Sequence, residues 1–95
     1  MYAVIFRANI SEMMDGYKEQ AKYLRDLAIN KYGCVEFTCV TEGSGEIAIS
    51  YWDDLALISK WKQDPEHLKA QDLGRRHYYS SYQVQVVEVL REYKV

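Results

Sequence analysis

The order of strand-like and helix-like segments constrains the fold of this 95-residue chain more than any other feature. Short β-rich runs are predicted at 2–8, 34–41, 46–52 and 82–93. Helices are predicted between the first two runs and between the last two. The resulting order, β-α-β-β-α-β, is typical of a ferredoxin-like antiparallel sheet with both helical segments on one face, which is an α+β fold.

Small residues mark where the chain turns in its first half. Ser11 is predicted to cap the first helix, and Gly33 is predicted to end it in the left-handed conformation. A hairpin turn is predicted at 42–45, because glycine tolerates the positive φ that such turns need. Along the first helix, apolar residues recur at steps of three and four on one face: Met14, Tyr17, Ala21, Leu24 and Ala28.

Acidic residues mark the helix starts of the second half. Asp53 or Asp54 is expected to cap a short helix. Asp64 then caps a further helix, with proline at its first position and a glutamate in its first turn. That helix is predicted to run to about Tyr79, with Gly74 as a soft or closely packed position.

The predicted strands carry apolar residues on both faces. A sheet with one solvated face should alternate apolar and polar residues instead. Apolar residues of opposite parity occur in every strand: Val4 and Ile5, Phe37 and Val40, Ile49 and Trp52, and Val86 and Val87. Since the helices of one chain cover a single face, we expect a second copy to cover the other in a symmetric homodimer.

Composition excludes several classes of protein. The 14 acidic and 12 basic residues give a net charge of -2, which argues against a dedicated nucleic-acid binder. No stretch approaches the roughly 18 apolar residues of a membrane span. Residues 1–7 lack the cationic lead and long apolar run of a signal peptide. We therefore expect residues 1–95 to form one cytoplasmic domain.

The two cysteines are not expected to form a disulfide. Cys34 and Cys39 are five positions apart in a predicted strand, which places them about 16 Å apart on opposite faces. With no histidine nearby in sequence they also make a poor metal pair. We expect free, buried thiols in a reducing compartment and no metal site.

Several short runs carry a resemblance to a known family. They lie at 33–37 (GCVEF), 46–52 (EIAISYW), 61–62 (WK), 65–67 (PEH) and 74–75 (GR). Together they resemble the antibiotic biosynthesis monooxygenases, over nearly the whole chain. The resemblance implies a small dimeric α/β barrel. One branch of that family oxygenates electron-rich aromatic compounds, such as quinols and anthrones, with molecular oxygen and without metal or flavin; many members have no established substrate.

A second branch of the family binds and degrades haem, and the chain matches it only in part. That branch has two tryptophans nine residues apart, as Trp52 and Trp61 are here. Its iron-ligating histidine follows ten residues later, where this chain has Gln71. An amide is a poor haem ligand. Use of His67 instead would change the register, so haem binding is a minor alternative.

His67 is the first candidate for a catalytic base. It is expected near the third residue of a helix, where the positive end of the helix dipole keeps an imidazole neutral and able to accept a proton. Gln71 and Arg75 follow at steps of four, and Tyr78 closes the helix. These side chains would form a column suited to an anionic aromatic compound. The alternative is a solvated polar face with a capping histidine.

Other pocket residues are expected on the strands and the preceding helix. The family resemblance places Trp61 at the pocket wall, although packing in the core explains it equally well. Tyr51 is also assigned to the pocket. Arg7 and Asn9 share a face of the first strand, and one of them is expected to line the pocket; alternatively, Arg7 pairs with a glutamate across the dimer.

The expected function is that of a homodimeric, cofactor-independent monooxygenase acting on a small aromatic quinol- or phenol-like compound with molecular oxygen. In this hypothesis His67 is the base, Trp61 lines the site, and Arg75 or Arg7 holds the developing anion. The alternative is a non-catalytic ligand-binding or sensing dimer of the same fold.

Overall fold

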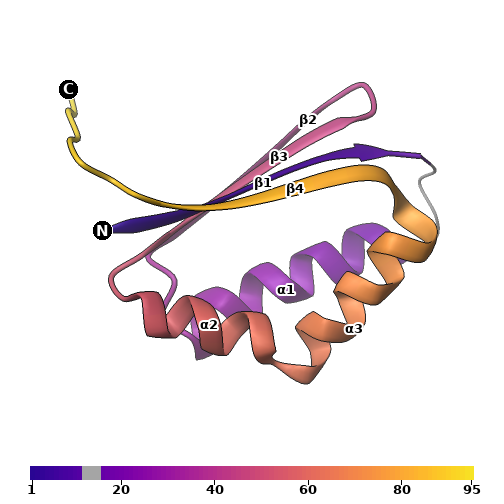
Figure 1. Cartoon of the computed structure of the whole chain (residues 1–95), viewed down its shortest axis with the longest axis horizontal. Coiled ribbons are helices and arrows are strands. Elements are labelled where there is room, and N and C mark those ends of the chain that lie inside the picture. The colour runs from indigo at the N-terminus through magenta and orange to yellow at the C-terminus, as the bar shows by residue number, and fades with distance from the viewer. Residues whose placement is uncertain (12–15) are drawn as a thin grey trace.

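A computed structural model of the chain describes residues 1–11 and 16–95 (Figure 1). The elements follow one another as β1 (Tyr2–Ile10), α1 (Tyr17–Lys31), β2 (Glu36–Glu42), β3 (Gly45–Trp52), α2 (Leu55–Gln63), α3 (Pro65–Leu73), the π-helical turn η1 (Gly74–Tyr78) and β4 (Tyr79–Glu88). None of the described helices is long and apolar enough to cross a membrane.

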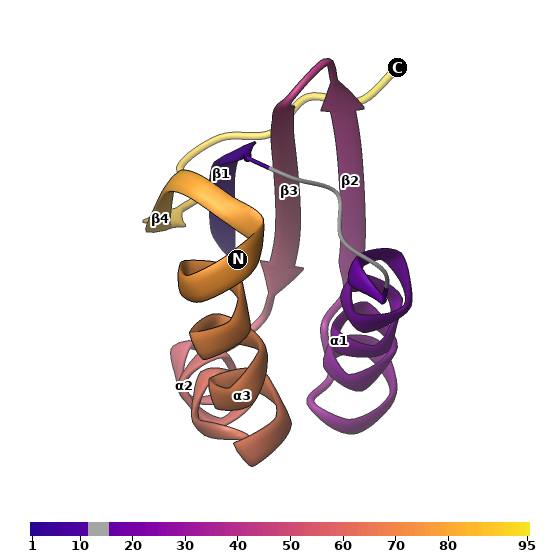
Figure 2. The same cartoon turned by 90° about the vertical axis from the view of Figure 1, so that its right-hand side faces the viewer.

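The four strands form one antiparallel sheet in the order β2-β3-β1-β4. Both helical segments lie on the same face of this sheet, with α1 on one side and α2 and α3 on the other (Figure 2). In the two central strands, Val4 lies opposite Ser50 and Phe6 opposite Ala48, and these four residues face the helices. The predicted ferredoxin-like α+β fold is confirmed.

The first helix begins later than expected. It starts at Tyr17 after Gly16, whose φ of 90° is left-handed, and no side chain of the described residues caps it. Ser11 is not the cap, because its N–H and hydroxyl both donate to the Tyr78 carbonyl, at 2.9 and 3.2 Å. Met14 lies outside the described residues. At the other end Gly33, with φ 76°, follows the helix as predicted.

Two aspartates cap the later helices. Asp54, and not Asp53, begins α2 by accepting a hydrogen bond from the Ala56 N–H at 2.8 Å. Asp64 begins α3 by accepting from the Glu66 N–H at 2.9 Å, as predicted. Proline follows it at the first helical position, where no donor is needed.

The third helix does not continue as an α-helix to Tyr79. It ends at Leu73, and a π-helical turn carries the chain into β4. Gly74 is closely packed rather than soft: a Cβ there would lie 2.7 Å from the Tyr79 ring. The wider turn therefore brings the start of β4 against the helix, and Gly74 leaves room for it.

The last strand is displaced from its predicted range. It runs from Tyr79 to Glu88, and Glu88 pairs with Tyr2 at the start of β1. Beyond that point β1 offers only the Met1 carbonyl, which accepts from the Val89 N–H at 3.0 Å. Residues 89–95 therefore have no strand to pair with, and they extend away from the body (Figure 1).

The core lies between the sheet, α1 and α2, at the end of the molecule away from the β2–β3 hairpin. Trp52 is fully buried there, and its ring packs against Trp61 with centroids 5.2 Å apart. None of the described helices covers the opposite face of the sheet (Figure 2). Val40 and Ile47 remain 59% and 39% exposed on that open face, so one layer of helices leaves part of the apolar sheet surface uncovered.

Candidate functional site

A cavity of about 460 Å³ lies between the helix-covered face of the sheet, α1 and α3. Figure 2 shows α1 and α3 separated beneath the strands at this place. Seven aromatic side chains of the described residues line it: Phe6, Tyr17, Phe37, Trp61, Tyr78, Tyr79 and Tyr82. Such a concave, mainly aromatic space is typical of a site for a small organic molecule.

His67 lines this cavity and rests against the core. It is only 8% exposed, and its ring meets the Trp61 ring edge-on with centroids 4.3 Å apart. Burial, assisted by the positive charge of Lys62, lowers the pKa of His67 to about 4. The ring is therefore neutral near pH 7, with burial as the leading cause. At that pKa the imidazole accepts hydrogen bonds but holds a proton weakly.

The buried Nδ1 atom of His67 has no hydrogen-bond partner in the part of the chain that the structure describes. An unpaired buried polar atom costs about 1–3 kcal/mol. A buried imidazole at a cavity wall with a strongly lowered pKa is a candidate functional group.

Three other predicted site residues share the cavity with His67. Trp61 belongs to its wall and to the hydrophobic core at once, and its indole N–H donates to the Leu24 carbonyl at 3.3 Å. Gln71 and Tyr78 complete this group. Tyr78 is buried, with its ring 4.9 Å from that of Tyr17.

Arg75 does not line the cavity. It is exposed on the π-helical turn, one residue after Gly74. The step of four from Gln71 to Arg75 places both on one face only in a continuous α-helix, and the wider turn changes that relationship. Tyr78 is the residue of η1 whose side chain lines the cavity.

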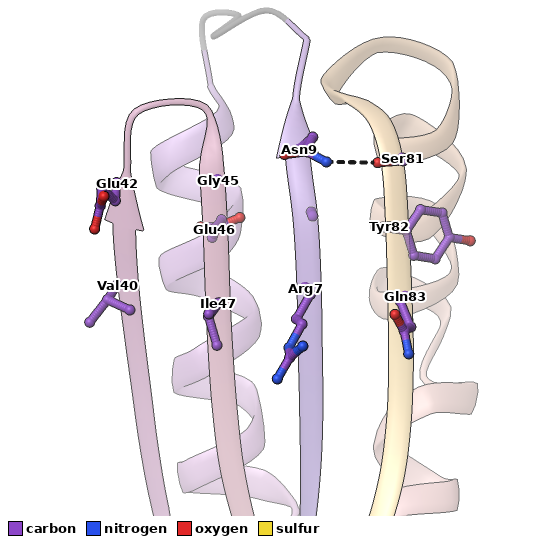
Figure 3. A pocket seen from close by; sticks show the side chains of 11 residues that line it. Arg7, Asn9, Val40, Glu42, Gly45, Glu46, Ile47, Ser81, Tyr82 and Gln83 are labelled. Carbon is purple, nitrogen blue, oxygen red and sulfur yellow. Dashed lines mark hydrogen bonds between the residues drawn. The ribbon is translucent and has the colours of Figure 1, made fainter.

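Arg7, Asn9 and Tyr51 lie on the open face of the sheet, away from His67. Alternation along β1 places Arg7 and Asn9 with Ala3, whose register partner in β3 is Tyr51. Arg7 and Asn9 line a separate hollow of about 440 Å³ (Figure 3). The Asn9 amide there donates to the Ser81 hydroxyl at 3.0 Å.

A polar network around Glu46 completes the cavity and was not among the predicted site residues. Glu46 is 7% exposed. Its Oε2 accepts a hydrogen bond from the Tyr17 hydroxyl, and its Oε1 accepts from the Cys39 thiol at 3.2 Å. The Tyr79 hydroxyl lies 3.0 Å from that of Tyr17. Four residues from α1, β2, β3 and β4 thus form one hydrogen-bonded chain at the cavity wall.

The three donors of this network keep their protons near neutral pH. Burial first, and then the hydrogen bond to Glu46, raises the pKa of Tyr17 well above its usual range and that of Cys39 to about 11. Burial likewise raises the pKa of Tyr79 to about 12. The Glu46 carboxylate has no ion pair with any described residue, so hydrogen bonds rather than a cation hold it.

One sequence signal pointed to Glu46. It has the parity of Ala48 and Trp52, which face the helices, and a carboxylate at such a position needs partners. Tyr79 was not predicted as a site residue, because it was expected to lie at the end of a helix and not at the start of a strand. Both cysteines are free. Cys34 is buried as expected, whereas Cys39 is exposed as a residue, although its thiol lies against Glu46 at the cavity wall.

Basic side chains also border the cavity. They are Lys18, Lys22, Arg25 and Lys62. None of the three lysines forms an ion pair with a carboxylate of residues 1–11 or 16–95. These cations favour a ligand that carries or develops negative charge. Within the same residues, no three His, Cys, Asp or Glu side chains are grouped so that they could hold a metal ion.

Comparisons with known proteins identify similar chains and folds. No family model matches the sequence. The chain is 39% identical over 92 residues to the uncharacterised protein YqjZ of Bacillus subtilis, covering 96% of this chain and 81% of that protein. The fold is similar to that of SnoaB, a cofactor-independent oxygenase from Streptomyces nogalater, with a TM-score of 0.81, 13% identity and coverage of 96% and 94%. It is also similar to an antibiotic biosynthesis monooxygenase structure, with a TM-score of 0.69, 14% identity and coverage of 96% and 100%.

Proposed function

The chain belongs to the same family as YqjZ of Bacillus subtilis and has the fold of the antibiotic biosynthesis monooxygenases. From that premise, we propose that its cavity binds a small aromatic phenol- or quinol-like compound and oxygenates it with molecular oxygen, without a resident cofactor. The observation that carries the proposal is the cavity itself, in which aromatic walls surround the neutral imidazole of His67.

The cavity supplies what such a reaction requires of a protein. An aromatic wall orients a planar ring and excludes water, and the imidazole hydrogen-bonds the oxygen of the substrate. The basic side chains Lys18, Lys22 and Lys62 favour the substrate anion over the neutral phenol. Arg75 has no part in this proposal, because it is exposed outside the cavity.

The redox chemistry belongs to the substrate and to oxygen. The substrate anion gives one electron to O₂, and the resulting radical pair combines at a ring carbon to form a peroxide anion. That anion takes back the proton that the substrate lost and becomes a hydroperoxide. Loss of water from that carbon breaks the O–O bond and leaves a carbonyl. One oxygen atom stays in the product and the other leaves in water, so the substrate supplies every electron and no further reductant is needed.

The cavity residues do not fit haem. Gln71 occupies the position of the iron ligand, and it lines the cavity with an amide, which haem iron does not favour. His67 lies four residues before that position, out of register with the ligand of the haem-degrading branch. The position of the family's iron ligand is therefore filled by an amide, and no step of the proposed reaction uses haem.

The open face of the sheet supports a homodimer as the working unit. Val40, Ile47 and Val87 are exposed there although they are aliphatic. Arg7 and Glu42 line the hollow in the same face, so charged groups of both signs are available to a second copy (Figure 3). We therefore assign Arg7 and Asn9 to this interface rather than to substrate binding.

Oxygen consumption tests the proposed function. A panel of hydroquinones, anthrones and flavonols is supplied to the protein in an oxygen electrode, with heat-denatured protein as the blank. The His67→Phe and Trp61→Phe variants should lower the rate at least about tenfold, the effect of losing roughly 1.4 kcal/mol of transition-state stabilisation. Glu19→Gln removes an exposed carboxylate outside the cavity and should leave the rate unchanged.

The alternative function is distinguished in the same experiment. A non-catalytic sensing dimer would bind members of the panel, as followed by tryptophan fluorescence, without oxygen uptake above the blank. Equal oxygen uptake by the wild type, His67→Phe and Trp61→Phe would show that the reaction does not take place in this cavity.

A further inference from the structure

We propose that Tyr79, Tyr17 and Glu46 form a proton relay that removes the hydroxyl proton of a phenol bound in the cavity and stores it on the Glu46 carboxyl group. This inference rests on the proposed function only in taking the ligand to be a phenol. It assigns the proton acceptor to Glu46, and it leaves His67 as a hydrogen-bonding group.

The relay has a fixed direction. A tyrosine hydroxyl carries one proton, and that of Tyr17 is donated to Oε2 of Glu46. In the 3.0 Å contact between the two phenols, Tyr79 must therefore be the donor and Tyr17 the acceptor. Because the hydroxyl proton of Tyr79 is donated to Tyr17, the Tyr79 oxygen can only accept a further hydrogen bond. Tyr79 lines the cavity, and we assign that acceptor to a ligand hydroxyl.

Proton transfer along this chain balances without any further reactant. The ligand proton moves to the oxygen of Tyr79, the proton of Tyr79 moves to Tyr17, and that of Tyr17 moves to Oε2 of Glu46. The ligand becomes a phenolate and Glu46 a neutral acid, and both tyrosines end with one proton each. No electron moves in this step. The thiol of Cys39 donates its hydrogen bond to Oε1 of Glu46, whereas the proton arrives at Oε2, so the thiol hydrogen bond is unchanged by the transfer.

The surroundings favour this redistribution of charge. Glu46 is a buried carboxylate held by two neutral donors and by no ion pair with a described residue, which is an expensive position for a negative charge. Transfer neutralises it and moves the charge to a ligand in a cavity bordered by cations. Besides Glu46 of β3, the titratable and charged side chains around the cavity are Tyr17, Lys18, Lys22 and Arg25 of α1, Cys39 of β2, Lys62 of α2, His67 of α3, Tyr78 of η1, and Tyr79 and Tyr82 of β4. Glu46 also lines the hollow of the open face, where the charged side chains are Arg7 of β1 and Glu42 of β2.

Two structural features hold the relay in place. The ring of Tyr79 packs against Phe6 and Tyr17, with centroids 5.4 and 5.9 Å apart. Gly74 accommodates that ring, because a Cβ at this position would lie 2.7 Å from it. The π-helical turn that begins at Gly74 therefore positions the cavity end of the relay, a role often seen for such turns at functional sites.

The ionisation of bound 4-nitrophenol tests this relay without any oxygen chemistry. The phenolate form of this probe absorbs visible light, so its ionisation midpoint is measured against pH with protein in excess. Binding is followed separately by quenching of tryptophan fluorescence. The compared proteins are the wild type, Tyr79→Phe, Glu46→Gln and the matched surface control Glu19→Gln.

The wild type and Glu19→Gln should lower the midpoint of the bound probe by about one pH unit or more relative to free probe, a tenfold shift in its ionisation equilibrium. In Tyr79→Phe and Glu46→Gln the midpoint should rise above that of the wild type, with the probe still bound, because only the bordering cations then favour the phenolate. If Glu46→Gln does not fold, Tyr79→Phe decides, because it leaves the bond between Tyr17 and Glu46 intact.

A midpoint in Tyr79→Phe equal to that of the wild type would overturn the relay. So would a wild-type midpoint at or above the free value, or a failure of the wild type to bind the probe. The outcome is separable from that of the oxygenase proposal. A lowered midpoint without oxygen uptake supports the relay and contradicts the oxygenase proposal. Oxygen uptake without a lowered midpoint supports the oxygenase proposal and contradicts the relay.

Discussion

The imidazole of His67 meets the indole of Trp61 edge-on, with ring centroids 4.3 Å apart and planes at 76°. Trp61 in turn packs on the fully buried Trp52. The polar group of the cavity is therefore held directly by the hydrophobic core. Sites supported by packed elements keep their geometry better than sites on free loops, so the core fixes where a ligand meets His67.

Acid should destabilise the protein through His67. Its pKa is lowered to about 4 in the folded state, from the usual 6.5. Between these values the unfolded chain binds a proton that the folded chain does not, so stability falls as the pH falls from about 6.5 to about 4. The full loss is about 3 kcal/mol, at 1.36 kcal/mol per pH unit. Urea unfolding of the wild type and His67→Gln at both ends of this range measures it.

The matched control for this pH dependence is His77→Gln, since His77 is exposed on η1. That variant should keep the stability difference of the wild type, whereas His67→Gln should lose most of it. Equal pH dependence in all three proteins would contradict the burial of a neutral imidazole at position 67.

Removing the Trp52 side chain should cost about 3–5 kcal/mol of unfolding free energy, the usual effect of truncating a large buried aromatic residue. Trp52 is fully buried, and its indole N–H donates to the Ser50 hydroxyl at 2.9 Å. Trp52→Phe keeps a ring and should cost less than Trp52→Ala. Denaturant unfolding checks both, and a loss below about 1 kcal/mol for Trp52→Ala would contradict this description of the core.

Gly74→Ala should disturb the relay through Tyr79. The backbone of Gly74 has ordinary helical angles, so alanine there would normally stabilise a helix by about 1 kcal/mol. Its methyl group would instead lie 2.7 Å from the Tyr79 ring and force the ring to move. We expect no gain in stability and a smaller shift of the 4-nitrophenol midpoint. In a Tyr79→Leu background there is no ring to displace, so Gly74→Ala should have a less unfavourable effect on the free energy of unfolding. An equal change in the free energy of unfolding in both backgrounds would contradict the contact between position 74 and the Tyr79 ring.

A charge on the open sheet face should dissociate the proposed dimer. In sedimentation velocity, the wild type should have the mass of two chains and Ile47→Asp the mass of one. Ile29→Asp is the control, because Ile29 is similarly exposed but lies on α1, away from the open face. A wild type that sediments as a single chain at every concentration would contradict the dimer.

Much of the fold could be predicted because its signals are local. Gly33 and the pair of Asp64 and Pro65 mark helix ends, and alternation assigns each strand residue to a face. The end of β4 could not be predicted in this way. It is set by where β1 begins, since Glu88 pairs with Tyr2 and the residues after it have no partner strand.

The candidate site was predictable only in part. Helical spacing correctly grouped His67 with Gln71, but it misplaced Arg75, because the α-helical step fails where the π-helical turn begins at Gly74. The network around Glu46 joins four elements that are distant in sequence, and no local pattern connects them. Parity alone pointed to Glu46 as a charged residue on the helix-covered face.

Oxygen-isotope labelling shows directly whether the cavity oxygenates its ligand. Anthrone is incubated with the protein under ¹⁸O₂ in unlabelled water, and the product is analysed by mass spectrometry against a protein-free blank. If the cavity oxygenates its ligand, the new carbonyl carries one ¹⁸O atom, the second atom appears in water, and the rate falls in His67→Phe. A product that forms no faster than in the blank, or whose new oxygen is unlabelled, would contradict the account.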